Sequence, residues 1–186
     1  MELNKAIKLR ASVRKFSSKK PNWRNIIEAI NIARYIPTAG KNYALKFILV
    51  YDRDNIKKIA KACQQDFISS AHYVVVVCSS PERLANAYGK ESGEVYTRQE
   101  AGAGIQNFLL SLEQEGLSTC WVGYFVEEQI KNTLKIPKNV NVEAVLPIGY
   151  QYDKKRVKKE PIDLDRILYF EKYGNAKMQE KESIDV

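Results

Sequence analysis

The chain has 186 residues, of which 45% are hydrophobic and 28% charged, so it can form one well-formed core, and its composition excludes a disordered or fibrous protein. The net charge of +8 favours association with phosphates, but no zinc-finger spacing, bZIP-like basic region or RNP-like motif is present. The three cysteines lie far apart, which argues against a disulfide framework and favours a reducing compartment. With no segment like a signal peptide, we expect a cytoplasmic protein with a single domain over 1–175 and a frayed tail over 176–186.

The chain opens with a basic segment, RASVRKF, at residues 10–16. If this segment is extended, every second side chain lies on one face. That face carries Arg10, Ser12, Arg14 and Phe16. Such a face suits an anion; the alternative is a solvated edge strand whose charge discourages pairing with other strands.

The first half then alternates between helix and strand patterns. Apolar spacing predicts a helix that begins after Asn22 and ends before Pro37. The stretch PTAGKNYA that follows is rich in turn formers, so we expect a loop. A short buried strand is predicted over 46–51, a helix over 55–63, and a strand covered on both faces over 73–78, where β-branched residues run continuously.

The second half begins with a long helix, predicted from about 94 to 115 and ended by Gly116. Within this helix, Gly102 and Gly104 each cost about 1 kcal/mol of helix stability relative to alanine. The close approach of another helix is one reason to accept that cost.

Two more strands and a helix are predicted beyond Gly116. The apolar stretch STCWVGYF predicts a strand that ends at Gly123, followed by an amphipathic helix over 127–134 and a strand over 140–150. The lysine-rich stretch 151–161 predicts a loop or arm. Together these patterns indicate a central sheet covered by helices.

Several familiar constellations are incomplete. GAGIQN lacks the third glycine of a dinucleotide fingerprint and falls inside a helix, and no P-loop is present. His72 is the only histidine, which excludes a two-histidine metal site, and we interpret it as structural. Cys120, in an apolar stretch, is interpreted as a buried, inert thiol.

Four stretches, taken in order, resemble the nitroreductase family of FMN-dependent oxidoreductases. They are RASVRKF, PTAGKN, AGIQNFLLSLEQEGLSTCWVGYF, and LPIGY followed by a basic arm. The resemblance covers most of the chain. It implies an α+β fold with a central, mostly antiparallel sheet covered by helices, in an intertwined homodimer with two FMN molecules at the subunit interface.

The resemblance also implies a set of cofactor-binding positions. These are Arg10, Ser12, Arg14, Pro37, Thr38, Ala39, Gly40, Asn42, Gln64, Val122, Gly123, Tyr124, Lys158 and Lys159. Arg10 and Ser12 correspond to phosphate and ribityl contacts, and Arg14 to the cation near flavin N1 and O2. A guanidinium there should raise the flavin's reduction potential by Coulomb attraction. The Gly123 N–H corresponds to the donor to flavin N5.

Other matches are looser. Residues 37–42 resemble a loop that reaches the flavin from the neighbouring subunit, although a plain helix-ending turn explains its proline and glycine equally well. Where the family usually continues with Gln-Pro-Trp, this chain has Ala44, Leu45 and Lys46. In the arm over the phosphate, Lys159 is the best positional match, and Lys158 or Arg156 could substitute for it. Either Gln64 or Gln65 could form the hydrogen bond to the flavin ring.

The activity implied is a transfer of hydride from NADH or NADPH to flavin N5, and then of electrons to a nitroaromatic, quinone or flavin acceptor. The cofactor carries this chemistry, so no side chain is assigned as catalytic and no metal is expected. Two alternatives stay open. Within the family, the protein could be a relative that uses reduced flavin for dehalogenation or for breakdown of flavin itself. Outside the enzyme class, it could be a basic nucleic-acid-binding module without flavin.

Overall fold

The computed structural model describes residues 2–153 and 159–178. It divides into two compact units, residues 1–156 and 157–186, and the single domain expected over 1–175 stays a prediction. Of the described elements, only the short 3-10 helix η3 (Leu164–Arg166) belongs to the second unit. Most of the expected tail lies outside the described residues. No helix in the described ranges is long and apolar enough to cross a membrane.

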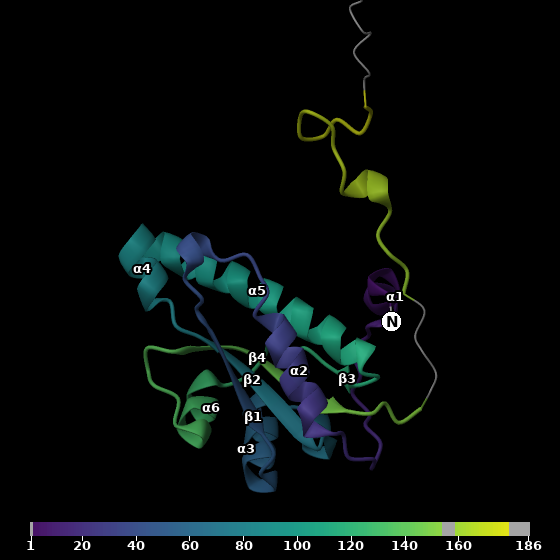
Figure 1. Cartoon of the computed structure of the whole chain (residues 1–186), viewed down its shortest axis with the longest axis vertical. Helices are drawn as coiled ribbons and strands as arrows, with labels where there is room; N and C mark the ends of the chain where they lie inside the picture. Colours follow the sequence, from purple (N-terminus) through teal and green to yellow (C-terminus); the bar gives the residue numbers. More distant parts are fainter. Residues whose placement is uncertain (1, 154–158, 179–186) are drawn as a thin grey trace, which may run out of the picture. The chain divides into compact units, whose positions relative to one another are not determined.

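A four-stranded sheet forms the centre of the first unit (Figure 1). Its strands lie in the order β1 (Leu45–Val50), β2 (Tyr73–Ser79), β4 (Asn141–Gly149) and β3 (Ser118–Thr119), and all neighbours are antiparallel. This confirms the antiparallel sheet that the family resemblance implied. β2 is buried along its whole length, as its continuous run of β-branched residues predicted.

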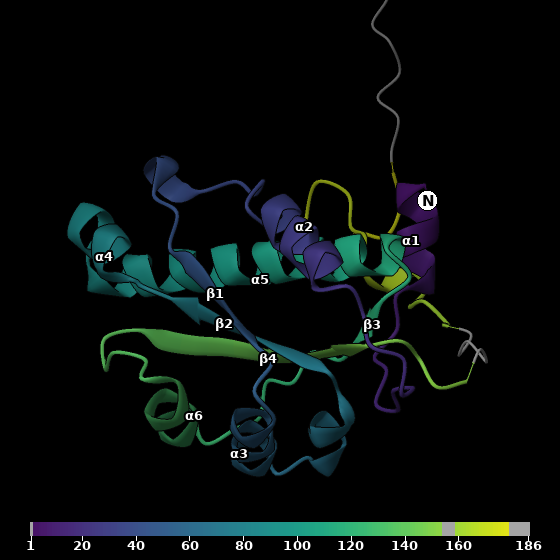
Figure 2. The ribbon, with the colours of Figure 1, turned by 60° about the horizontal axis from the view of Figure 1, so that its bottom comes forward.

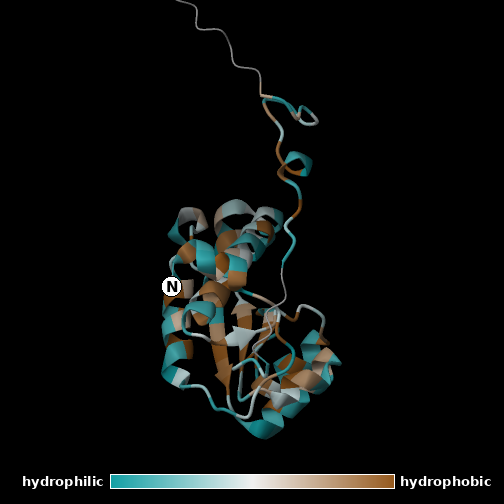
Figure 3. Ribbon diagram, turned by 90° about the vertical axis from the view of Figure 1, so that its right-hand side faces the viewer, coloured by the Kyte–Doolittle hydropathy of each residue, from teal (hydrophilic) through white to brown (hydrophobic). Residues whose placement is uncertain are grey.

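Helices cover both faces of the sheet (Figure 2). On one face lie α2 (Trp23–Ala33) and the long α5 (Lys90–Gln114), and on the other lie α3 (Arg53–Cys63), the 3-10 helix η2 (Asp66–Ser70) and α6 (Glu127–Leu134). Alternate strand residues therefore enter different clusters: Val75 packs toward α2 and α5, while Val74 packs toward α3 and α6. Figure 3 shows the largely hydrophobic strands between these layers.

The predicted helices are present, and some of their ends differ from the prediction. α2 begins after Asn22, whose side chain accepts the Arg24 N–H, and α6 has the predicted bounds. α3 begins at Arg53, two residues earlier than predicted, because Asp52 caps it by accepting the Asn55 N–H at 2.9 Å.

Two short helices were not predicted from the sequence. They are α1 (Leu3–Leu9) and α4 (Glu82–Tyr88), and each buries a single residue, Ala6 and Leu84 respectively. With one buried position in seven residues, neither helix has the repeating apolar spacing from which a helix is predicted.

Two strand predictions need correction. β1 is only partly buried, because it is an edge strand with a neighbour on one side. β3 ends at Thr119 rather than continuing to Gly123. The ladder with β4 is interrupted at Cys120 and Trp121, and Val122 then pairs with Val145 in the same register.

The glycines of α5 differ in their surroundings. A Cβ on Gly104 would lie 2.6 Å from Leu45 Cδ1 and 3.6 Å from the Ala33 carbonyl oxygen, so this glycine admits strand β1 and the end of α2. Gly102 has nothing within 4 Å of such a Cβ, so close approach does not explain it within this chain. Gly116, with φ of +70°, ends the helix as predicted.

Candidate functional site

The basic opening segment lies beside β3 and the chain that leaves β4. Ser12 forms a parallel bridge with Thr119, and the Val13 N–H donates to the Thr119 carbonyl oxygen at 2.9 Å. Phe16 forms an antiparallel bridge with Gln151. The structure therefore brings RASVRKF together with the STCWVG and LPIGY stretches, which follow it by more than a hundred residues.

Two buried side chains anchor this segment. Val13 and Phe16 are 8% and 7% exposed, whereas Ser12 and Arg14 are exposed. Phe16 packs directly on Gly149, where an added Cβ would lie 2.8 Å from the ring atom Cδ1. The predicted strict alternation is thus wrong at Phe16, because this side chain enters the core while Arg14 stays at the surface.

The two arginines of the segment carry uncompensated charge. Arg10 is half-buried at the end of α1, where its backbone N–H donates to the Ala6 carbonyl oxygen at 2.9 Å, and Arg14 is exposed. Within residues 2–153 and 159–178, neither guanidinium has a carboxylate at ion-pair distance. A guanidinium group without a carboxylate partner can bind a phosphate or another anion.

An exposed backbone N–H follows the β3 stretch at Gly123. The nearest atom to an added Cβ on this glycine would be Trp121 Nε1 at 4.0 Å, and no acceptor for the Gly123 N–H is found among the described residues. Its neighbours differ: Val122 is buried and exchanges two 3.0 Å backbone bonds with Val145, whereas Tyr124 is 66% exposed. Gly123 can therefore offer a main-chain donor to a ligand.

Gln64 is the left-handed residue that ends α3, with φ of 55° and an exposed side chain. The helix end it belongs to is tied to the chain just past Gly123, because the Ala62 carbonyl accepts the Val126 N–H at 2.8 Å. Gln65 is half-buried. Both glutamines thus lie in the same region of the fold as Gly123.

The loop at residues 37–42 lies elsewhere in the chain. It is held by Glu100 in the middle of α5, which accepts the N–H groups of Ala39 and Ala44. About 20 Å of helix separates Glu100 from Gln114, beside which α1 lies (Figures 1 and 2). Within one chain, the structure does not bring this loop to the arginine segment.

The predicted binding residues of this loop differ in solvent exposure. Pro37 and Gly40 are exposed, and Thr38, Ala39 and Asn42 are half-buried. Gly40 has φ of 57°, which glycine adopts without strain. The Asn42 side-chain N–H donates to the Ala39 carbonyl at 3.3 Å.

The three residues that depart from the family pattern have mainly structural surroundings. Ala44 and Leu45 are buried, and Leu45 fills the space above Gly104. Lys46 is exposed. In this chain, therefore, only Lys46 of the three presents a polar group to solvent.

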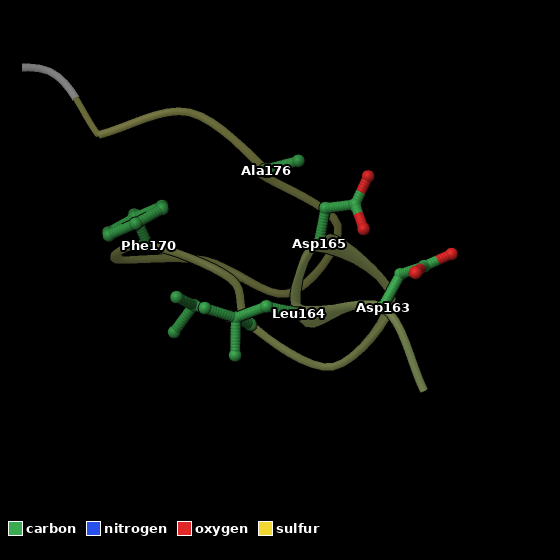
Figure 4. A pocket seen from close by; sticks show the side chains of 6 residues that line it. Asp163, Leu164, Asp165, Phe170 and Ala176 are labelled. Atoms are coloured by element: carbon green, nitrogen blue, oxygen red, sulfur yellow. The ribbon is translucent and has the colours of Figure 1, made fainter. Parts of the chain in front are cut away.

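Of the predicted arm residues, the structure describes only Lys159. Arg156 and Lys158 lie outside the described residues. Lys159 is exposed and belongs to the second unit. The same unit has an open hollow of about 550 Å³, lined by Asp163 and Asp165 and by apolar residues such as Leu164 and Phe170 (Figure 4).

The three thiols are buried, and the histidine contacts a backbone carbonyl. All three cysteines are buried, and burial raises the pKa of Cys63 to about 12 and that of Cys78 to about 11. Cys120 is 2% exposed. His72 Nε2 lies 2.9 Å from the Ser18 carbonyl oxygen. Within the described ranges, no group of three or more histidine, cysteine or acidic residues could hold a metal ion.

Three residues around these segments were not identified from the sequence as important for the site. Glu100 shares helical spacing with the buried Gly104 and Phe108, so a charge on an otherwise apolar face could have marked it. Gly149 gave no local signal, because its role depends on a side chain far away in sequence. Thr119 is 4% exposed, and its hydroxyl has no hydrogen-bond partner among the described residues.

The comparisons with known proteins agree on one family. A model of the nitroreductase family matches residues 7–80 and 57–150. A protein from Archaeoglobus fulgidus, with the provisional name NADH dehydrogenase/NAD(P)H nitroreductase, is 28% identical over 159 residues, covering 83% of this chain and 88% of the relative. An iodotyrosine deiodinase from Thermotoga neapolitana is 22% identical over 176 residues, covering 80% and 88%. The solved NADPH:FMN oxidoreductase from Vibrio harveyi, in complex with NAD+, has the same fold, with a TM-score of 0.81 and 19% identity over 92% of this chain and 77% of that one.

Proposed function

Because the chain belongs to the nitroreductase family and is therefore a flavin-dependent oxidoreductase, we propose that it binds FMN and uses NADH or NADPH to reduce nitroaromatic, quinone or flavin acceptors. One observation carries this proposal. Among the described residues, the guanidinium groups of Arg10 and Arg14 and the main-chain N–H of Gly123 have no partner, and they lie on segments that pair with one another in the fold.

These residues fit the two ends of FMN. Bound FMN would supply the hydride-accepting centre and the relay of electrons to the acceptor. Arg10 and Ser12 would hold the phosphate, to which a guanidinium can donate two parallel hydrogen bonds. Arg14 would place a fixed positive charge near the pyrimidine edge, and the Gly123 N–H would orient the ring by hydrogen bonding.

The surroundings of the other reactive groups agree with a site whose chemistry comes from the cofactor. The His72 ring contacts a backbone carbonyl, and the thiols of Cys63 and Cys78 stay protonated near neutral pH because burial raises their pKa. None of these three is placed beside Arg14 or Gly123 by any bond found among the described residues. The chain's own task is therefore to bind and orient.

The separation of the two predicted segments supports a homodimer. The loop at 37–42 cannot serve the same flavin as Arg14 within one chain, so a second protomer would have to supply it. Large side chains left exposed on α2 and α5, including Trp23, Ile27 and Val95, are available to pack against that protomer.

A second candidate reaction is reductive dehalogenation, favoured by the similarity to an iodotyrosine deiodinase. The two reactions share the binding site and differ in the acceptor. Release of iodide from iodotyrosine by the reduced protein, with no turnover of nitroaromatics or quinones, would favour dehalogenation.

The first experiment is the visible absorption spectrum of the purified protein, followed by anaerobic addition of NADPH and, separately, NADH. We expect a bound flavin spectrum that bleaches with at least one donor. A protein that stays colourless after incubation with FMN and desalting would overturn the proposal.

A matched pair of variants tests the role of Arg14. Arg14→Ala should weaken FMN retention or lower its reduction potential, because it removes a cation from the site. Lys19→Ala should do neither, since the Lys19 ammonium lies 4.7 Å from the Tyr150 ring centroid and pairs with that ring. Equal behaviour of the two variants in flavin titration and potentiometry would contradict the assignment.

A further inference from the structure

Glu100 is a buried acidic residue in the middle of α5, with 4% of its surface exposed. Both carboxylate oxygens face the loop that joins α2 to β1. Oε1 accepts the Ala39 N–H at 3.2 Å, and Oε2 accepts the Ala44 N–H at 3.1 Å. One side chain therefore holds two points of the loop, one on each side of Asn42.

The backbone between those two points is tightly turned. Gly40 and Lys41 are consecutive left-handed residues, with φ of 57° and 60°. The Asn42 N–H donates to the Ala39 carbonyl at 3.1 Å, and the Ala44 carbonyl accepts the Ser80 N–H at 2.9 Å. The loop is thus joined to α5 through Glu100 and to the end of β2 through Ser80.

The carboxylate and this loop conformation depend on each other. A buried charge is costly unless hydrogen bonds satisfy it, and here the loop supplies two donors. No cation lies at ion-pair distance from Glu100 among the described residues, so these N–H groups are the main compensation. If the loop unwinds, the carboxylate loses both donors at once.

We propose that Glu100 is a positioning residue that holds the loop at 38–44 in one conformation, so that Thr38 and Asn42 are presented preformed to the flavin of a partner subunit. This inference rests on the proposed function. Glu100 itself lies beneath the loop and acts through it, so its contribution is to avoid the cost of ordering the loop when the cofactor binds.

The nearby Tyr43 phenol is compatible with this role. Burial raises the pKa of Tyr43, and the negative charge of Glu100 raises it further. The phenol therefore stays neutral near neutral pH, and no second negative charge develops beside the carboxylate.

The test compares Glu100→Gln with Glu127→Gln. Glutamine keeps the shape but offers one acceptor and a donor, so one loop N–H loses its partner. Glu127 is a matched control, because it also accepts a backbone N–H, that of Val142 at 2.9 Å, but lies on α6, on the face of the sheet opposite α5. The first measurement is amide hydrogen exchange of the cofactor-free protein, and the second is fluorescence titration with FMN.

For Glu100→Gln we expect about tenfold faster exchange confined to residues 38–44 and about tenfold weaker FMN binding, the effect of losing one charge-assisted bond. The control should change neither. Unchanged exchange in the loop would show that Glu100 does not hold the loop and would overturn the proposal. Faster exchange with unchanged FMN binding would overturn the role of Glu100 in presenting the loop to the flavin.

Glu100→Asp provides a second variant in case the glutamine variant does not fold. It keeps the charge but withdraws the carboxylate, so intermediate exchange and affinity are expected, and wild-type values for both would overturn the proposal. Failure of the proposed function is seen separately. The wild-type protein would then bind no FMN, while hydrogen exchange of the loop would still report whether Glu100 holds it.

Discussion

Gly149→Ala should destabilise the protein, because Phe16 occupies the space that a Cβ would need. The added carbon would lie 2.8 Å from Phe16 Cδ1 and 3.0 Å from its Cβ and Cγ. Carbon atoms pack best at about 3.5–4.0 Å, so the ring must retreat by up to about 1 Å. Phe16 is 7% exposed and is bridged to Gln151, which leaves little room for that movement.

The expected loss in the free energy of unfolding is about 1–3 kcal/mol, the usual cost of overpacking a core. Without the clash, replacing glycine by alanine would stabilise by about 0.4–1 kcal/mol through the unfolded state. The sign of the change therefore reports on the Phe16 contact. Urea unfolding of the wild type and the variant gives the difference.

A double-mutant cycle isolates that contact. In a Phe16→Ala background, Cγ and Cδ1 are absent and only the 3.0 Å contact with the retained Cβ remains, so the cost of Gly149→Ala should be smaller than in the wild type. FMN binding should also weaken in Gly149→Ala alone, because the segment that carries Arg14 is displaced. An equal cost in both backgrounds would refute the reasoning.

Three further predictions concern the core and its charges. Thr119→Val should raise the free energy of unfolding by about 1 kcal/mol in chemical denaturation, since it removes a buried hydroxyl that has no partner among the described residues; a loss of stability would contradict this. Burial tends to raise the pKa of the Glu127 carboxyl, but its hydrogen bonds from Lys131 and from a backbone N–H lower it on balance, so its stabilising effect is present above the unfolded-state pKa and is lost as pH falls through the folded-state value. The acid side of the stability profile should therefore be flatter in Glu127→Gln. Cys63 and Cys78 should not react with a thiol reagent at pH 8 in the folded protein and should react in denaturant, since burial raises their pKa to about 12 and 11.

Helices and strands with strong local patterns could be predicted from the sequence. α6 follows from apolar spacing, β2 from its continuous run of β-branched residues, and the start of α2 from the Asn22 cap. The two short helices and the true length of β3 could not be predicted, because their residues lack a repeating apolar pattern or depend on a partner strand.

The candidate site divides in the same way. Motif order identified Arg10, Arg14 and Gly123 as binding residues, and those assignments stay predictions. Nothing local in the sequence says that the arginine segment lies along β3, or that Phe16 requires a glycine at 149. Such contacts join residues more than a hundred positions apart, and they exist only when the sheet has formed.

By itself, the sequence determined which strongly patterned segments are helical or extended and where its basic and glycine residues occur, because side-chain spacing fixes which face of an element is apolar. Only the tertiary structure decided that the loop at 37–42 is separated from Arg14 in one chain and is held by Glu100. The Ala39 N–H and the Glu100 carboxylate are 61 positions apart. Their bond requires α2, α5 and β1 to pack closely around Gly104. Such packing depends on the volumes of side chains that are distant in sequence, so no local pattern predicts it.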